Sequence, residues 1–311
     1  MVRLPAIAAA TVTALSTVSA HAVPLTASQI LAGYNLVTEG NATTQSDIQG
    51  NAVIGGNFNG ATVFNSNQPT HPEIDIYGSN IGNLNVDNGG LVHYGTNTGH
   101  FNLNGGATAV QGNFSNTLSS FTTTLNQLST QLDGLTSNST VSKTNNTLTF
   151  NAAPGANGIA VFSFTAATLQ ADFSGVSNIA FSQNGAKSII INVDGNFVDP
   201  SGANWNAPAL QDVLFNFYDA TTVTLNNWEA SILAPDASVK IASGNIEGFV
   251  YANTFVGGGE LHNDPFTGSL PVSEPGALAI FGLGLAGLIA AKTTATRRFV
   301  LTGLRATSPL A

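Results

Sequence analysis

Two pairs of carboxylates stand at spacings that could support chemistry. Glu73 and Asp75 are two residues apart on an expected strand, so their side chains share one face. Asp194 and Asp199 stand on either side of a Gly-Asn turn. Either pair could work as acid and base in glycoside hydrolysis, or could supply oxygen ligands to Ca²⁺. Turn capping and solubility are simpler roles for the same residues, because the sequence carries no EF-hand loop.

Other chemistry has little support in the sequence. Four histidines lie beyond residue 22, and none pairs at the i, i+4 or His-x-His spacing of a metal site: His71, His93, His100 and His262. We expect them to be polar surface residues. The chain has no cysteine and no Gly-x-Ser-x-Gly elbow, so thiol chemistry is excluded and a serine hydrolase is not indicated. We therefore expect no catalytic residue, no cofactor-binding residue and no metal ligand.

The elements that would position these residues are short strands. From residue 33 to 114, apolar runs of three to five residues alternate with Asn and Gly, which accept the backbone of tight corners. Ile81, Leu84 and Val86 are expected to point inward at roughly a two-residue period. This pattern predicts a mostly β fold, a parallel β-helix-like solenoid, with a β-sandwich as the alternative.

One segment has a helical period instead. Between residues 117 and 135, Leu and Phe recur at steps of three and four, and Gly134 offers a stop. This predicts one amphipathic α-helix packed alongside the sheet, with partner binding as the less favoured role. Strands are expected to resume at residues 159–164, 188–193, 213–218 and 223–241.

Charge is scarce and unevenly placed. Only 8% of the 311 residues are charged, whereas about a quarter is usual. Between residues 23 and 275 there are three lysines and 17 acidic residues, a net charge of −14. Such a surface repels phosphate backbones, so we expect no nucleic-acid partner. The same region has no arginine, which argues against enzymes that cleave acidic polysaccharides with Arg or Lys.

The N-terminus has the features of a secretory signal peptide at residues 1–22. Arg3 precedes an apolar stretch that extends to about residue 18. Ala20 and Ala22 then fit the small-residue rule for cleavage, which places the mature start at Val23.

The C-terminus has the features of a membrane segment at residues 276–296. Residues 276–291 contain no polar side chain, and Lys292 can extend to the interface. The tail at residues 297–311 is basic, which predicts a cytoplasmic location by the positive-inside rule.

The C-terminal motifs resemble a PEP-CTERM sorting signal. Ser273-Glu274-Pro275 precedes the apolar segment, and Arg297 and Arg298 follow it. The resemblance implies processing by an exosortase-type membrane enzyme of Gram-negative bacteria, and a link with exopolysaccharide and biofilm. The chain departs from the family pattern twice: Ser273 replaces the first Pro but leaves the Glu-Pro core intact, and residues 299–311 extend past the arginines.

The region at residues 23–268 resembles the choice-of-anchor A domain, and residues 269–275 follow it as linker and sorting motif. The resemblance is carried by Tyr34-Asn-Leu-Val, Ile48–Asn57, Trp228–Pro235, Asn245–Ala252 and Gly259–Asn263. It implies an extracellular domain that is displayed on different surface anchors, without an established activity. The order of strands and helix is also similar to ice-binding β-helices.

Together these features predict an exported, non-enzymatic structural or adhesive protein of the cell surface or matrix. Its expected partners are the exosortase, the membrane and extracellular polysaccharide. One alternative is a glycoside hydrolase that acts on exopolysaccharide through the carboxylates named above. A second is an ice-binding solenoid, which would need Thr-x-Thr on successive turns, whereas Thr222-Val-Thr224 stands alone. Five aromatic residues could stack on sugar rings, although core packing is the simpler role: Trp205, Trp228, Tyr77, Tyr94 and Tyr251.

Overall fold

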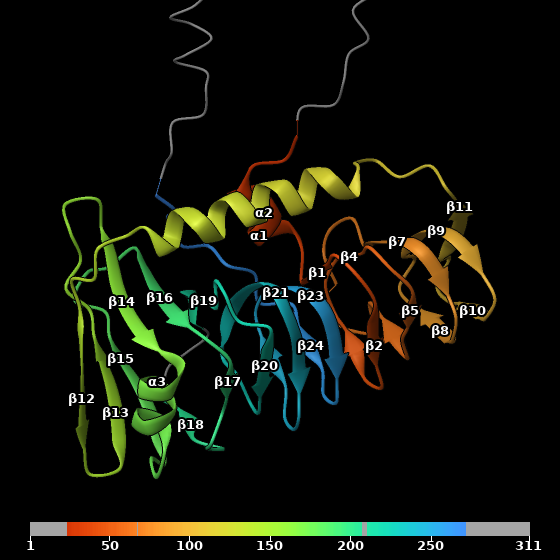
Figure 1. The fold of residues 1–311 in the computed structure, drawn as a ribbon. Helices are drawn as coiled ribbons and strands as arrows, with labels where there is room; N and C mark the ends of the chain where they lie inside the picture. Colours follow the sequence, from red (N-terminus) through yellow and green to blue (C-terminus); the bar gives the residue numbers. More distant parts are fainter. Residues whose placement is uncertain (1–23, 67, 207–209, 272–311) are drawn as a thin grey trace, which may run out of the picture.

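The computed structural model describes residues 24–66, 68–206 and 210–271 (Figure 1). The expected signal peptide with Ala20 and Ala22, the membrane segment at residues 276–296 and the basic tail lie outside these residues. The sorting residues also lie outside them: Ser273, Glu274, Pro275, Arg297 and Arg298. Among the helices of the described residues, none has the length and apolarity needed to cross a membrane.

A large sheet of 14 strands forms one side of the molecule. Ten of its strands pair in parallel in the order β11 (Thr108–Gln111), β9 (Leu91–Asn97), β7 (Glu73–Asn80), β4 (Ala52–Ile54), β1 (Leu36–Thr38), β23 (Val250–Gly257), β21 (Ala230–Ile241), β19 (Leu210–Asn216), β16 (Ser188–Asp194) and β14 (Ile159–Thr165). Four further strands pair beside β7, β21 and β23: β5 (Phe58–Asn59), β2 (Ala42–Thr44), β20 (Thr222–Leu225) and β17 (Phe197–Val198).

Two smaller sheets close the core. The six-stranded sheet has the order β10 (His100–Leu103), β8 (Asn83–Val86), β6 (Thr62–Val63), β3 (Asp47–Ile48), β24 (Leu261–His262) and β22 (Ile246–Glu247). The four-stranded sheet has the order β12 (Thr140–Thr144), β13 (Thr147–Asn151), β15 (Asn178–Ser182) and β18 (Asn204–Trp205).

The strands are parallel almost throughout. Among the ladders of the described residues, only β12 and β13 pair antiparallel, through a two-residue turn at Asn145 and Asn146 with φ of 48° and 60°. The prediction of a mostly β chain is therefore confirmed, with parallel strands that wrap into a barrel-like arrangement. The β-sandwich alternative does not fit, because the sheets of a sandwich are antiparallel.

The chain does not stack its strands in sequence order. It starts at β1 in the middle, reaches one end at β11, and continues from the opposite end at β12 (Figure 1). The later strands then return to the middle, where Leu36 of β1 pairs with Val250 of β23. The N-terminal half (residues 36–111) and the C-terminal half (residues 140–262) thus meet at this junction.

Helix α2 (Leu118–Asp133) connects the two far ends. It lies along the outer face of the large sheet from the β11 end to the β14 end (Figure 1). Its buried side chains are those expected from the three-four spacing, Phe121, Leu125, Leu128 and Leu132. They pack with Val53, Tyr251 and Leu233 of the sheet. The expected helix and its packing role are confirmed.

Two shorter helices were not expected from the sequence. Helix α1 (Ala27–Gly33) begins at a capping box in which Thr26 and Gln29 exchange hydrogen bonds, and it packs beside α2. Helix α3 (Ala166–Phe173) follows the N-cap residue Thr165 and buries Leu169 and Phe173 in the core of the C-terminal half.

Polar contacts also hold α2 on the sheet. The Ser129 hydroxyl donates to Asn216 Oδ1 at 2.6 Å, and Asn216 Nδ2 donates to the Asn192 side chain at 2.9 Å. Asn192 Nδ2 in turn donates to the carbonyl of Leu132 at 2.6 Å. Because these groups are buried, each loss would leave an unpaired polar atom, so the network fixes where α2 lies.

Corner residues follow two distinct rules. Gly89 and Gly105 have φ of 75° and 61°, the left-handed backbone that glycine adopts without strain. Gly55 instead allows close approach, since a Cβ there would lie 2.0 Å from the carbonyl oxygen of Glu39.

The expectation that Ile81 points inward is wrong: Leu84 and Val86 are buried, but Ile81 is 48% exposed. A two-residue period cannot place residues 81 and 84 on the same face.

Candidate functional site

The end of the large sheet that α2 does not cover carries a flat outer surface. In the parallel register, Val198 aligns with Thr224, Lys240, Val256, Thr43 and Asn59 on adjacent strands. A second row two residues earlier contains Thr222, Ser238 and Thr254. We call these nine residues the exposed rows. The residues between them point into the core, as strand alternation requires: Val223, Val239, Phe255, Ala42 and Phe58.

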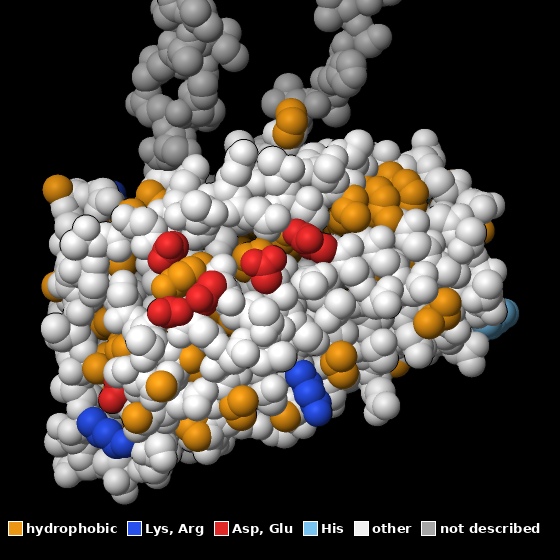
Figure 2. All heavy atoms as spheres, in the orientation of Figure 1, with side chains coloured by type: hydrophobic (Ala, Val, Ile, Leu, Met, Phe, Trp, Pro, Cys, Tyr) orange, Lys and Arg blue, Asp and Glu red, His pale blue; other side chains and the backbone are white. Residues whose placement is uncertain are grey.

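The chemistry of the exposed rows is mixed. Val198 and Val256 are 53% and 42% exposed, and hydroxyl, amide and lysine side chains lie beside them. Neighbouring strands lie about 4.8 Å apart, so the rows present small groups at a regular spacing. Figure 2 shows single hydrophobic side chains spaced over the lower part of this face, below a group of Asp and Glu side chains.

Asparagine amides continue the second row into the N-terminal half. Asn41 Oδ1 accepts from the backbone N–H of Asn57 at 2.8 Å. Asn57 Oδ1 accepts from the backbone N–H of Ser79 at 3.0 Å. Thr-x-Thr occurs once in the exposed rows, at Thr222 and Thr224. The described strands therefore lack the Thr-x-Thr repeat on successive turns that an ice-binding solenoid would need.

An acidic cavity lies between α2 and the exposed rows. Its volume is about 230 Å³, and Asn126, Asp133, Tyr218 and Asp236 are among its lining residues. The cavity gives this edge of the exposed rows a negative character.

The expected Asp194–Asp199 pair has different partners. A hydrogen bond with Asp219, together with its charge, raises the pKa of the exposed Asp194 carboxyl. Burial raises the pKa of Asp199, against hydrogen bonds from Ser201 and Asn226 that lower it. Asp199 Oδ1 accepts from the backbone N–H of Ser201 at 3.0 Å, so its contacts are those of a turn cap.

The expected Glu73–Asp75 pair forms a cluster with His93. Asp75 and His93 face each other in the register of β7 and β9. His93 Nδ1 lies 2.9 Å from Asp75 Oδ1 and 3.0 Å from Glu73 Oε1. The three ligand atoms lie within 4.8 Å of one another, and the side chains of His93 and Asp75 are 5% and 4% exposed. His93 was expected at the surface, and this expectation is wrong.

The field at this cluster is negative. Burial, then the charge of Glu73, raises the pKa of Asp75 to about 6 against the effect of His93. Burial, followed by the charges of Glu73 and Asp75, raises the pKa of the nearby Tyr34 hydroxyl to about 12. Two carboxylates thus share a site of low dielectric.

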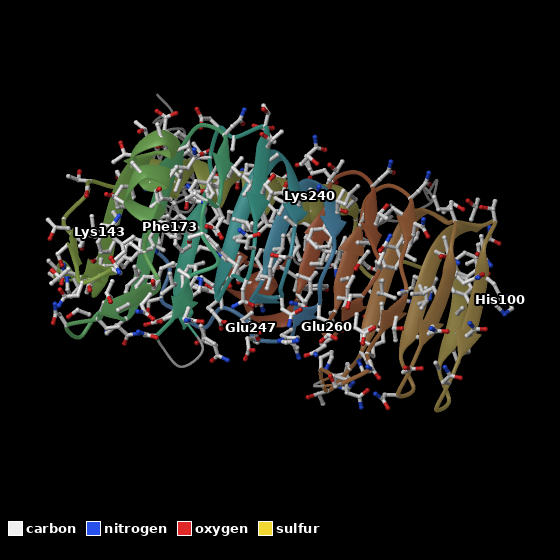
Figure 3. All side chains as sticks on the ribbon, turned by 90° about the horizontal axis from the view of Figure 1, so that it is seen from below. His100, Lys143, Phe173, Lys240, Glu247 and Glu260 are labelled. Carbon is white, nitrogen blue, oxygen red and sulfur yellow. The ribbon has the colours of Figure 1, made fainter. Side chains whose placement is uncertain are left out.

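A second histidine cluster lies on the six-stranded sheet. His262 Nδ1 contacts Glu247 Oε1, and Nε2 lies 2.9 Å from Glu260 Oε2. Burial and a hydrogen bond with Asp264 raise the pKa of Glu247 to about 7. Burial lowers the pKa of His262, but the hydrogen bonds and charges of Glu260 and Glu247 outweigh it and raise that pKa overall. Figure 3 shows Glu247 and Glu260 on the opposite side of the strands from Lys240.

The sequence carried weak signals for both clusters. Glu73-x-Asp75 and Glu260-x-His262 are two residues apart, so each pair shares a strand face. The third residue of each cluster, His93 or Glu247, comes from a neighbouring strand. The sequence does not show how the two strands align. The expectation of surface histidines is confirmed for His71 and His100, which are exposed.

The aromatic residues pack against other side chains of the protein and do not present free faces for stacking on sugar rings. Trp228 and Tyr251 are fully buried. Trp205 stacks on Phe181 at 6.1 Å, and Tyr94 lies 5.1 Å from Phe101. Tyr77 stacks on Phe114 at 4.2 Å. The core-packing alternative is therefore the correct one.

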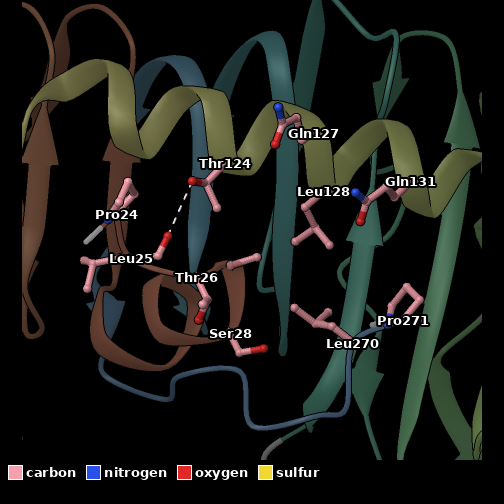
Figure 4. Close-up of a pocket in the computed structure, with 11 residues that line it drawn as sticks. Pro24, Leu25, Thr26, Ser28, Thr124, Gln127, Leu128, Gln131, Leu270 and Pro271 are labelled. Carbon is pink, nitrogen blue, oxygen red and sulfur yellow. Dashed lines mark hydrogen bonds between the residues drawn. The ribbon is translucent and has the colours of Figure 1, made fainter. Parts of the chain in front are cut away.

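Both ends of the described chain lie against α2. A cavity of about 390 Å³ is lined by Pro24 and Leu25 at one end, Leu270 and Pro271 at the other, and Leu128 of the helix (Figure 4). Thr124 Oγ1 donates to the carbonyl of Leu25 at 3.4 Å. The described part of the chain therefore ends at Pro271 on the helix side of the molecule, away from the exposed rows.

The parallel strands that wrap around one core and the long helix along the large sheet define a mostly β domain. Residues 27–263 match the family described as Putative Ice-binding-like adhesive domain, which covers most of the chain, and the protein belongs to this family. Residues 271–298 match the PEP-CTERM protein-sorting motif and include Ser273, Glu274, Pro275, Arg297 and Arg298. The resemblance to a PEP-CTERM signal is thus confirmed, whereas choice-of-anchor A is not the family named.

The two matches together indicate an exported surface protein that is processed by an exosortase-type system. The family also favours a non-enzymatic role. Among curated proteins and among solved structures, the comparisons found no match to this chain.

Proposed function

We propose that the protein is an adhesin that binds extracellular polysaccharide through its exposed rows. The observation that carries this proposal is the flat, regular surface of hydroxyl, amide and methyl groups at the end of the large sheet that α2 leaves open. A polysaccharide presents hydroxyls and apolar ring faces at a repeating spacing, and many weak contacts along a long surface sum to useful avidity.

The rest of the chain delivers this surface. Cleavage after Ala22 releases the signal peptide, residues 276–296 hold the protein in the inner membrane of a Gram-negative cell, and the tail at residues 297–311 stays cytoplasmic. The exosortase-type enzyme then acts at Glu274-Pro275, and the domain reaches the surface or the matrix. The stacked strands act as a β-helix-like display unit, the role that the choice-of-anchor A resemblance also implies, in an exopolysaccharide-rich biofilm.

Substitutions on the exposed rows test the binding surface. The double variant Val198→Glu, Val256→Glu places two charges on the rows and is expected to weaken retention on purified exopolysaccharide at least tenfold. Leu103→Glu, Val110→Glu is the matched control, because it adds two charges at apolar residues that are 43% and 40% exposed but lie on β10 and β11, outside the rows. Equal retention of the double variant and wild type would contradict the proposal.

Sorting is tested separately by cell fractionation and intact mass. The native protein is expected to start at Val23, to end near residue 275 and to be found outside the cell. A Glu274→Ala, Pro275→Ala variant is expected to remain in the membrane with its tail. If both proteins keep the tail through Ala311, the exosortase step is wrong.

Ice binding is the second candidate, because Thr222, Thr224, Thr254 and Thr43 lie on the exposed rows and the family description includes ice. Lys240 and Val256 interrupt the hydroxyl pattern. Ice recrystallisation inhibition by wild type, lost in the Val198→Glu, Val256→Glu variant, would favour this function over polysaccharide binding.

A further inference from the structure

In the cluster of Glu73, Asp75 and His93, two carboxylate oxygens face the single proton that His93 Nδ1 can carry. Nδ1 of an imidazole carries at most one hydrogen. His93 Nδ1 makes its hydrogen bond with Asp75 Oδ1, and Glu73 Oε1, although 3.0 Å from the same nitrogen, is buried without a hydrogen-bond partner. A buried carboxylate oxygen without a partner is costly, so a cation that contacts all three atoms would stabilise this arrangement.

No amino group of the described chain supplies that cation. Lys143 Nζ donates to the carbonyl of Ser174 at 2.6 Å, and Lys187 packs against Gly158, both in the C-terminal half. Lys240 lies on the exposed rows. A metal ion would provide the positive charge and accept all three donor atoms together.

The donor set and its spacing indicate the class of ion. Ligands about 2.1 Å from one ion lie about 3.0 Å apart at adjacent octahedral positions and about 3.4 Å apart at tetrahedral positions. The two distances from His93 Nδ1, 2.9 and 3.0 Å, lie at the short end of this range. Imidazole nitrogen suits zinc, iron, nickel and copper, and carboxylate oxygens also suit manganese, whereas Ca²⁺ and Mg²⁺ prefer oxygen ligands alone.

The cavity beside Glu73 gives an ion a path to the cluster. Phe114, from the segment between β11 and α2, covers the His93 ring edge-on at 6.2 Å. Glu73 keeps 31% of its side chain exposed, and it borders a cavity of about 450 Å³ that His71 and Asn88 also line. This cavity has room for water molecules at the remaining coordination positions.

We propose that Glu73, Asp75 and His93 bind a divalent first-row transition-metal ion such as Zn²⁺ or Mn²⁺. The ion joins β7 to β9 and so secures the end of the sheet from which the chain enters α2. Its role is structural, since ions that bind only the folded state stabilise it.

Calorimetric titration of the full-length protein in detergent tests the site. The protein carries no affinity tag and is treated with EDTA and dialysed before Zn²⁺, Mn²⁺ or Ca²⁺ is added. We expect one Zn²⁺ or Mn²⁺ per chain, a rise in Tm of several degrees and no binding of Ca²⁺. Absence of Zn²⁺ and Mn²⁺ binding in wild type would overturn the proposal.

Matched variants locate the ion. Glu73→Gln keeps the size of the partly exposed side chain and is expected to weaken binding at least tenfold, whereas Glu260→Gln, in the other histidine cluster, leaves it unchanged. Unchanged binding in Glu73→Gln would overturn the assignment. X-ray absorption of the zinc-loaded wild type is independent of variant folding, and it should show oxygen ligands with a single imidazole. Two or more imidazoles would place the ion elsewhere.

Discussion

The N-terminal and C-terminal halves build the same parallel stack from different interiors. The C-terminal half contains a continuous group of rings in which Trp228 lies 4.7 Å from Phe215 and 4.8 Å from Trp205. The strands of the N-terminal half enclose Val, Ile and Leu with Phe58 and Phe64, and asparagine side chains join their corners. Parallel register, more than any one kind of side chain, therefore defines this architecture.

The two histidine clusters differ in a similar way. In the C-terminal half, His262 gives each ring nitrogen its own carboxylate, so a doubly protonated imidazolium satisfies both partners. In the N-terminal half, His93 presents one nitrogen to two carboxylates. The same residue types therefore lead to an ion pair in one half and to a candidate metal site in the other.

The largest expected effect concerns the aromatic interior. Trp228→Ala removes a fully buried ring and should lower the free energy of unfolding by about 4 kcal/mol. Trp228→Phe should cost only about 1–2 kcal/mol, because Trp228 Nε1 is buried without a hydrogen-bond partner and its removal relieves that penalty. Urea denaturation measures both. If Trp228→Phe loses as much free energy of unfolding as Trp228→Ala, the indole nitrogen has a hydrogen-bond partner.

The next effect separates the two histidine clusters. In EDTA, His93→Ala removes the hydrogen-bond partner of the buried Asp75 carboxyl and should cost about 3 kcal/mol. His262→Ala affects a group whose side chain is 24% exposed and whose partners can hydrate, so a loss of about 1 kcal/mol is expected. Chemical denaturation of both variants in the same buffer gives the comparison. A larger loss at His262 would reverse the contrast drawn between the clusters.

The sequence shows some of these features and conceals others for a physical reason. Helix α2 is visible because its contacts repeat every three or four residues along the chain. The short strands and their Asn-Gly corners are visible for the same local reason. The pairing of Leu36 with Val250, and of Asp75 with His93, depends on registers between distant segments, which no local period encodes. The two-turn helices α1 and α3 are too short to show a period.

A smaller effect is expected at the asparagine corners. Asn57→Ala leaves the backbone N–H of Ser79, which is 8% exposed, without its acceptor and should cost about 1–2 kcal/mol. Asn57→Asp retains an acceptor oxygen and serves as the control. Hydrogen exchange at the Ser79 amide should accelerate in Asn57→Ala and stay slow in Asn57→Asp. Equal exchange in both would mean that the side chain does not join the corners.

The smallest effect concerns the pH dependence of the C-terminal cluster. The pKa of Glu247 is raised to about 7 by burial and Asp264, and the pKa of His262 is also raised. The folded state therefore holds these protons more tightly than the unfolded chain, so the free energy of unfolding falls as the pH rises from about 5 to about 8. Both groups act in the same direction.

Glu247→Gln isolates this contribution, because the amide resembles the protonated carboxyl at every pH. The variant should match wild type near pH 5 and should lose less of its Tm by pH 8, with a difference of a few degrees at most, since the cluster is partly exposed to solvent. Thermal unfolding at four pH values is sufficient. Parallel Tm profiles for the two proteins would mean that Glu247 releases its proton at an ordinary pKa. Of the two histidine clusters, only the one at Asp75 would then hold a carboxyl proton more tightly than the unfolded chain does.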